Sequence, residues 1–315
     1  ARRDFTINAM AMEKGGRILD LYGGIRDLKG ETVRCVGNAR IRFEEDALRI
    51  LRALRFAATL GFAIELSTAE AIHREARLLE RVAAERILAE MNKLLCGKGC
   101  REILLAYPDV LGVFLPELLP CVGFDQRNIH HCYDLYTHIV LSVDSVAAEP
   151  VLRWTMLLHD IGKPVVRKTD ENGRDHFKMH GIAGEKMAAQ ILRRLKFDND
   201  TIRKVTRLVK WHDDRPEGMT KAVRRAVNRI GEDLFPYYLE VQQADMLAQS
   251  DYRRAEKQER LDKVKEAYET IINEHQCVSL KTLAVTGKDL IEAGYKPGRE
   301  IGETLNRLLE VVLVD

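Results

Sequence analysis

The sequence predicts a mostly α-helical protein that begins with a short segment of strands and turns. From Arg40 onward, almost every segment has the residue pattern of a helix. Pro108, Pro116 and Pro120 punctuate one connection between helical parts. The charged run over residues 252–274 has the length and composition of one exposed helix.

Four parts follow one another along the chain. Residues 1–38 carry turn residues such as Gly23-Gly24 and are expected to form strands and turns. Residues 39–100 are expected to be helical. Residues 101–250 include a segment rich in His and Asp from about residue 128, and residues 251–315 hold the charged helix and a glycine-containing tail. A chain of 315 residues has room for two or three compact units.

The overall charge does not by itself indicate a nucleic-acid-binding protein. Lys and Arg number 50 against 48 Asp and Glu, which gives a net charge of +2. Any RNA-binding surface must therefore come from local clusters of basic residues. Such clusters occur at residues 74–86, 193–196, 203–210 and 221–229.

The cysteine pattern and the apolar runs indicate a cytoplasmic protein without a membrane segment. None of the six cysteines forms a Cys-x-x-Cys pair, and their spacing does not suggest a secreted disulfide framework. The sequence has no signal peptide and no apolar run near 18 residues. It does not indicate the oligomeric state.

Residues 43–56 are predicted to form one helix with Asp46 and Arg49 on its polar edge. At about 100° per residue, the two side chains project within roughly 60° of each other. The carboxylate can accept from the amino group of adenine or cytosine, and the guanidinium can donate to the neighbouring ring nitrogen. Guanine and uracil present the reversed pattern and would be rejected. The alternative is a surface ion pair worth a few tenths of a kcal/mol.

Several blocks of residues flank this segment in a fixed order. They are Arg2-Arg3-Asp4-Phe5-Thr6-Ile7-Asn8, Asp20-Leu21-Tyr22-Gly23-Gly24-Ile25-Arg26-Asp27, Leu60-Gly61-Phe62 and Ala84-Glu85-Arg86-Ile87-Leu88-Ala89-Glu90. Together with residues 45–55 they resemble the bacterial-type (class II) tRNA nucleotidyltransferase and poly(A) polymerase family. The resemblance implies CCA addition to tRNA 3′ ends, with ATP and CTP as substrates and tRNA as partner. It also implies a head remnant (1–38), neck (39–100), body (101–250) and tail (251–315).

The resemblance further implies a set of nucleotide-binding residues. Asp46 and Arg49 correspond to the template for the incoming base. The full set is Arg3, Asp4, Asn8, Asp46, Arg49, Arg52, Glu85 and Arg86. In this set Arg3, Asp4 and Asn8 contact the sugar and triphosphate, and Glu85 and Arg86 hold the template helix. Arg52 projects away from Arg49 around the helix, so packing, ion pairs or RNA phosphates are alternative roles.

The sequence also departs from the family pattern. Family members carry a glycine-rich turn and an Asp-x-Asp pair that holds metal ions for attack by the RNA 3′ hydroxyl. Both precede the Arg-Arg-Asp block, whereas this sequence starts at Ala1. We therefore expect an N-terminally truncated protein that lacks the catalytic carboxylates. The Mg²⁺ ligands for nucleotide transfer would be missing, and this chain would not transfer nucleotides by itself.

A second set of residues that could bind a metal or take part in catalysis lies in the middle of the chain. Seven of the nine histidines fall between His130 and His212. His138 lies in an apolar helix, His159-Asp160 closes another, and Asp245 lies on a later helix. This order resembles the HD phosphohydrolase superfamily, an all-helical fold in which the four corresponding side chains bind a divalent metal. The alternative is that His138 and His159 are ordinary core histidines.

The same resemblance extends to three further residues. His180 and His212 fall where HD proteins place ligands for a second metal, but each is equally compatible with a satisfied or exposed histidine. Lys163 could neutralise a substrate phosphate or be a surface lysine at a helix end. The mixed nitrogen and oxygen ligands suit a divalent transition metal or Mg²⁺, which would activate water towards phosphate esters.

Three functions are compatible with these residues. The first is a truncated CCA-adding tRNA nucleotidyltransferase with an HD domain at about residues 128–250. The second is an HD-type phosphatase or phosphodiesterase acting on nucleotides or RNA ends. The third is an RNA-binding module without catalysis. The ordered blocks favour the first function, and the first two can coexist in one protein.

Overall fold

The computed structural model describes residues 3–314, so Arg2 of the first block lies outside it. The chain is mostly helical with a few short strands, which confirms the predicted fold class. It divides into two compact units. The first comprises Ala1–Lys210 with Leu247–Ser250, and the second comprises Trp211–Met246 with Asp251–Asp315. The division into head, neck, body and tail stays a prediction.

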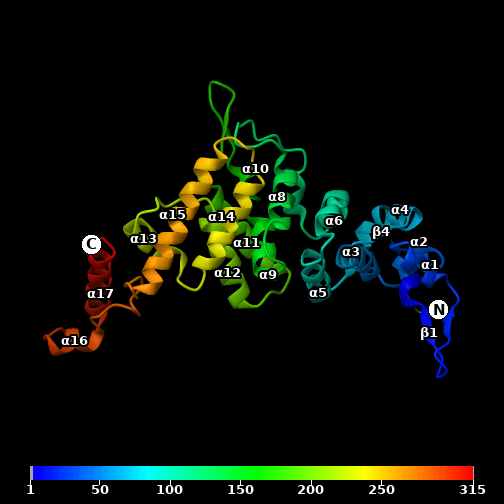
Figure 1. The fold of residues 1–315 in the computed structure, drawn as a ribbon, viewed down its shortest axis with the longest axis horizontal. Helices are drawn as coiled ribbons and strands as arrows, with labels where there is room; N and C mark the ends of the chain where they lie inside the picture. The colour runs from blue at the N-terminus through cyan, green and yellow to red at the C-terminus, as the bar shows by residue number, and fades with distance from the viewer. Residues whose placement is uncertain (1–2, 315) are drawn as a thin grey trace. The chain divides into compact units, whose positions relative to one another are not determined.

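The first unit holds the segment of strands and turns and most of the helices (Figure 1). Its α-helices are α1 (Gly24–Lys29), α2 (Ala39–Glu45), α3 (Leu48–Leu60), α4 (Leu66–Glu75), α5 (Ala84–Leu95), α6 (Cys100–Ala106), α7 (Pro108–Gly112), α8 (Leu135–Asp144), α9 (Pro150–Leu158), α10 (Lys163–Val166), α11 (His180–Arg194) and α12 (Asn199–Trp211). Its 3-10 helices are η1 (Thr6–Asn8), η2 (Ala76–Arg81) and η3 (Pro116–Cys121).

The strands of the first unit pair only two at a time among the described residues. Strand β1 (Met10–Met12) is antiparallel to β2 (Ile18–Asp20), and β5 (Lys168–Thr169) is antiparallel to β6 (Asp175–His176). Strand β3 (Thr32–Val33) runs parallel to β4 (Ala63–Ile64). The β3–β4 pair therefore joins the residues before α2 to those after α3.

Helix α3 is central to the packing of the N-terminal half of the first unit. It packs against α5 through apolar faces that include the fully buried Leu51, Leu54, Met91 and Leu94. Each such side chain contributes roughly 1.5–3 kcal/mol of hydrophobic stabilisation. Phe56 of α3 also packs edge to face against Phe5, with ring centroids 5.6 Å apart. This packing fixes α3 relative to the first block of the chain.

The second half of the first unit packs α8 against α9. Both helices are largely buried and apolar, and they carry His138 and the segment that ends at His159. The second unit contains α13 (Thr220–Ile230), α14 (Phe235–Leu247), α15 (Arg254–Asn273), α16 (Gly287–Glu292) and α17 (Arg299–Val312). Helix α15 confirms the predicted long charged helix. Over residues 3–314, no helix combines the length and apolarity that crossing a membrane requires.

Candidate functional site

The first candidate site lies at the junction of α2 and α3, and its backbone differs from the prediction. Residues 43–56 do not form one helix, because Asp46 is extended (φ −152°, ψ 103°) and separates α2 from α3. Its carboxylate accepts a hydrogen bond from Leu48 N at 3.1 Å, and its carbonyl accepts from Arg49 N. The expectation that Asp46 and Arg49 share one helical face was therefore wrong. Asp46 instead ends α2, and its hydrogen bond from Leu48 N makes a tight turn just before the helix that carries Arg49.

Asp46 and Arg49, the predicted template pair, each form an ion pair with a different neighbouring residue. Arg86 of α5 contacts the carboxylate of Asp46 at 2.9 Å. Arg49 contacts Glu45 at 2.6 Å and donates to the carbonyl of Arg42 at 3.0 Å. The guanidinium of Arg49 lowers the pKa of Glu45 below its usual value. The two template side chains are thus positioned by neighbours and do not pair directly with each other.

The remaining predicted nucleotide-binding residues, which are Glu85 and three residues of the first block, occupy different surroundings. Arg3 and Glu85 are exposed, and Asn8 ends η1 and is half-buried. Asp4 is buried and contacts Arg52 of α3 at 2.6 Å. The ion-pair alternative for Arg52 is therefore what the structure shows. That contact ties the first block to the template segment.

Glu90 is a residue that sequence reasoning missed. It is 7% exposed and contacts Arg55 at 2.8 Å and Arg52 at 3.9 Å. One buried carboxylate thus connects α5 to both arginines of α3. The signal was present in the sequence, because Glu90 interrupts the apolar stripe of Ile87 and Met91 on α5.

The block around Asp20 forms a tight turn into α1. The carboxylate of Asp20 accepts from the backbone N–H of Gly24 at 2.7 Å and of Ile25 at 2.9 Å. The hydrogen bond from Ile25 is the main reason why the pKa of Asp20 is lowered. A Cβ on Gly24 would lie 2.3 Å from the carbonyl oxygen of Thr6, so only glycine fits there. Buried Asp27 accepts from the Thr6 hydroxyl at 2.8 Å, which fastens α1 to the first block.

The second candidate site is a cluster of buried histidines around Asp160. His138, His159 and Asp160 are each at most 1% exposed, and their ligand atoms lie within 4.8 Å of one another. The Nε2 atoms of His138 and His159 are both 3.3 Å from Asp160 Oδ2. His180 adds its Nε2 at 3.4 Å from Asp160 Oδ1. Three imidazoles therefore converge on one carboxylate.

Backbone carbonyls fix the orientation of these three rings. The Nδ1 atoms of His138, His159 and His180 lie 3.1, 2.7 and 2.8 Å from the carbonyl oxygens of Ala248, Met156 and Phe177. A carbonyl only accepts, so each Nδ1 carries a proton and each ring directs its Nε2 atom towards Asp160. Histidines that bind metals typically donate the other ring N–H to a carbonyl or carboxylate in this way.

Lys163 is buried and belongs to this cluster, so the surface alternative for it was wrong. Its ammonium contacts Asp160 Oδ2 at 2.7 Å and donates to Gln126 Oε1 at 2.9 Å. Burial favours a raised pKa for Asp160, but the charges of Lys163 and His159 outweigh it and hold the pKa well below its usual range. Gln126 was not singled out from the sequence. It comes from a loop 37 positions before Lys163, and no local pattern indicates this contact.

Asp245 and His212 belong to the second unit. Asp245 on α14 contacts Arg215 at 3.4 Å. His212 follows α12, and its carbonyl accepts a hydrogen bond from Gln242. Both side chains are buried. Their predicted roles as metal ligands stay predictions.

Three family models match different parts of the chain. The model described as poly A polymerase head domain matches residues 1–34. The model described as the RNA and SrmB-binding site of polymerase A matches residues 61–121. The model described as tRNA nucleotidyltransferase domain 2 matches residues 179–315.

Individual relatives agree with these matches. An A-adding tRNA nucleotidyltransferase of Deinococcus radiodurans is 33% identical over 98% of this chain and 73% of its own length. A CC-adding tRNA nucleotidyltransferase of Thermus thermophilus is 34% identical over 98% of this chain and 71% of its own length. These relatives and a CCA-adding enzyme of Ligilactobacillus salivarius are longer than this chain, which spans between 65% and 73% of their lengths.

A solved structure extends the similarity to the fold. The Bacillus stearothermophilus CCA-adding enzyme in complex with CTP is 26% identical, with a TM-score of 0.67 over 99% of this chain and 68% of that chain. The fold, the ordered blocks and the relatives agree over nearly all of the sequence. The chain belongs to the family of tRNA nucleotidyltransferases and poly(A) polymerases.

Proposed function

We propose that this protein selects cytidine and adenosine nucleotides for addition to the 3′ end of tRNA, with CTP and ATP as substrates. Relatives named for A addition, CC addition and CCA addition support the reaction class. The relative solved with CTP supports the nucleotide class. The observation that carries the proposal is the α2–α3 junction, where Asp46 and Arg49 are each held by a neighbouring charge.

The choice of nucleotide follows from the hydrogen-bond donors and acceptors on the edge of the base. Asp46 would accept from the amino group of adenine or cytosine, and Arg49 would donate to the adjacent ring nitrogen. A carboxylate has about four lone-pair sites, and Leu48 N and Arg86 use some of them. Because Arg86 and Glu45 already hold the two side chains, little ordering is required when the base binds. Metal-assisted attack by the 3′ hydroxyl is not assigned to any residue of this chain.

The test is misincorporation by Asp46→Ala in the full-length enzyme. Loss of one bidentate partner should reduce discrimination against G and U by roughly 10- to 100-fold, while tRNA affinity changes little. Glu44→Ala is the matched control, because Glu44 is an exposed acid on α2 that pairs with Arg40. If Asp46→Ala misincorporates G and U only as often as Glu44→Ala, the template assignment is wrong.

We propose as a second function that the histidine cluster binds a divalent metal and hydrolyses phosphate esters. The donor set fits such an ion, because the Nε2 atoms of His138 and His159 lie 3.2 Å apart beside a carboxylate, and in neutral rings their lone pairs would face each other. Two lone pairs at that distance repel unless a proton or a metal lies between them. His138, His159, Asp160 and His180 would hold the ion, which would supply an activated water when bound. Lys163 would neutralise a phosphate oxygen.

The metal that remains bound to the protein after dialysis tests whether the histidine cluster is a metal site. His159→Ala combined with Asp160→Ala should abolish retention of Mn²⁺, Ni²⁺ or Zn²⁺ after dialysis, while nucleotide addition by the full-length enzyme persists. His176→Ala is the control, because His176 pairs with Asp170 on the β5–β6 hairpin. Unchanged metal content in the folded double variant would exclude the cluster as a metal site. Loss of metal without any phosphate-ester hydrolysis in the parent would leave a structural site and exclude the hydrolase.

A further inference from the structure

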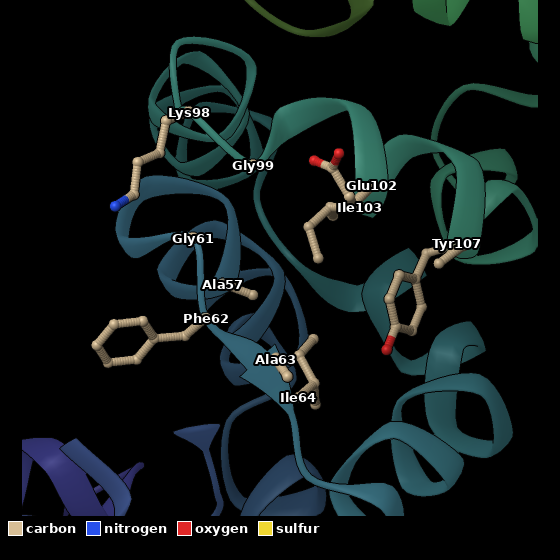
Figure 2. A pocket seen from close by; sticks show the side chains of 11 residues that line it. Ala57, Gly61, Phe62, Ala63, Ile64, Lys98, Gly99, Glu102, Ile103 and Tyr107 are labelled. Carbon is tan, nitrogen blue, oxygen red and sulfur yellow. The ribbon is translucent and has the colours of Figure 1, made fainter. Parts of the chain in front are cut away.

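A separate cleft of about 600 Å³ lies in the first unit between the end of α3, strand β4 and helix α6 (Figure 2). Its floor includes Ile64 and Ile103, and its rim carries Lys98, Glu102 and Tyr107. None of these residues belongs to the α2–α3 junction or to the histidine cluster. Nearly the whole lining falls within residues 61–121, the region matched by the RNA and SrmB-binding model.

Small residues make the cleft broad. Gly61 ends α3 with a φ of +68°, where other residues would be strained. Beside the cleft, a Cβ on Gly97 would lie 2.6 Å from the backbone of Ala58, so the connection between α5 and α6 approaches α3 closely. Ala57 and Ala63 add little volume to the lining. The result is a wide apolar surface that suits a flat ring.

The polar groups at the rim are available to a ligand. Lys98 and Glu102 are exposed, and within residues 3–314 neither forms an ion pair. The ring of Tyr107 is buried and stacks on His73 with centroids 4.8 Å apart. Figure 2 shows its hydroxyl directed towards the side of the cleft formed by Ile64.

The hydroxyl of Tyr107 makes no hydrogen bond within the described part of the chain. Burial raises the pKa of this phenol, with a smaller contribution from Asp109, so it stays protonated and able to donate. The hydroxyl oxygen keeps contact with solvent, so a ligand in the cleft can reach it and accept its hydrogen bond.

We propose that this cleft binds an unstacked nucleobase of the RNA substrate, one that carries an exocyclic amino group. The apolar floor contacts the face of the base, Glu102 accepts from the amino group, and Tyr107 donates to a ring nitrogen or carbonyl. Lys98 contacts the adjoining phosphate. Adenine, cytosine and guanine have the amino group and uracil lacks it. The proposal rests on the proposed transfer to tRNA, which supplies the RNA.

The charges favour a nucleotide over an apolar side chain of a protein partner. An apolar side chain would make no hydrogen bond or ion pair with Glu102, Lys98 or the Tyr107 hydroxyl. A nucleotide offers a donor, an acceptor and an anion together. Binding of guanine distinguishes this cleft from the template pair. The cleft is expected to accept guanine, whereas Asp46 and Arg49 are expected to reject both guanine and uracil.

The first test compares GMP and UMP binding to the chain by ligand-observed NMR. We expect GMP to bind more tightly than UMP, and Glu102→Gln to weaken GMP binding about tenfold, the effect of losing one charged hydrogen bond. UMP binding should not change. Equal binding of GMP and UMP by the parent, or GMP binding unaffected by Glu102→Gln, would overturn base recognition.

The second test measures tRNA affinity at fixed salt concentration. Tyr107→Phe, which removes only the hydroxyl, and Lys98→Ala should each weaken tRNA binding several-fold. Lys93→Ala is the control, because Lys93 is also an exposed lysine, on α5. If the parent binds tRNA and the variants match Lys93→Ala, the cleft proposal fails while the proposed function stands. If the parent does not bind tRNA, the proposed function itself fails.

Discussion

The α2–α3 junction and the histidine cluster use charged side chains in opposite surroundings. At the junction, Asp46 is 35% exposed and its partner Arg86 is 51% exposed. In the cluster, Asp160 is 1% exposed and its partner Lys163 is 7% exposed. Exposed ion pairs contribute little to stability and can exchange partners with a ligand. A buried charge depends on its partner for the fold itself. The comparison shows that similar distances have different consequences when burial differs.

The largest expected effect is on stability in the cluster. Asp160→Ala removes the carboxylate beside the buried Lys163 ammonium and should lower the free energy of unfolding by about 3–5 kcal/mol. Urea denaturation in the presence of a chelator measures this change. Asp170→Ala on the β5–β6 hairpin should cost much less, because its pair with His176 is only half-buried and water screens it. If both variants lose the same free energy of unfolding, burial does not distinguish the two kinds of ion pair.

An intermediate effect is expected at Glu90, the buried acid near the junction. Glu90→Gln weakens its contacts with Arg52 and Arg55 and should cost about 1.5–3 kcal/mol. Thermal or urea unfolding provides the measurement. Glu85→Gln on the same helix is the control and should lie within about 0.5 kcal/mol of the parent, since Glu85 is exposed. A cost for Glu90→Gln no larger than that of the control would show that burial is not decisive here.

Replacing Arg86 should change the stability of the protein only slightly. It should measurably change the selectivity between nucleotides. Arg86→Ala should change the free energy of unfolding by less than about 1 kcal/mol. Without Arg86 the carboxylate of Asp46 is less well positioned, so G and U misincorporation by the full-length enzyme should rise, although less than for Asp46→Ala. Arg81→Ala, at an exposed arginine of η2, is the control. Parent-level fidelity in Arg86→Ala would mean that Asp46 needs no positioning partner.

The last prediction concerns Glu65, which caps α4 and whose effect on stability varies only at acidic pH. Burial opposes ionisation of Glu65, but hydrogen bonds from Thr68 and Ser67 lower its pKa from 4.5 to about 2. Because the folded pKa is depressed, the stabilisation is complete above about pH 4.5 and is lost as the pH falls towards 2. The unfolding free energy of Glu65→Gln should therefore depend less on pH over this range. An identical slope in both proteins would exclude Glu65 as a contributor.

Local patterns in the sequence predicted much of the fold. The mostly helical class and the helix of residues 252–274 are confirmed, with α15 spanning Arg254–Asn273. The break at Asp46 was not predicted, because periodicity over residues 43–56 is satisfied equally by one helix or by two consecutive helices. At the break the backbone of Asp46 is extended, and its carboxylate accepts a hydrogen bond from Leu48 N.

The candidate sites were predicted less completely than the helices. His138, His159 and Asp160 were identified together and lie together. The burial of Lys163 was not foreseen, because it depends on Gln126 from a distant loop. Glu90 and the cleft at Tyr107 also depend on which helices pack together. Sequence spacing does not specify such contacts.

The sequence by itself determined the helices and the ordered motifs, because hydrogen bonds and side-chain spacing within a few residues decide them. Only the tertiary structure decided which charged groups are buried and which are exposed. Burial sets the energy of an ion pair and the pKa of a carboxylate, and it comes from residues far apart in the chain. Asp46 and Asp160 are both aspartates beside a cation, and the helices packed around each one give them different properties.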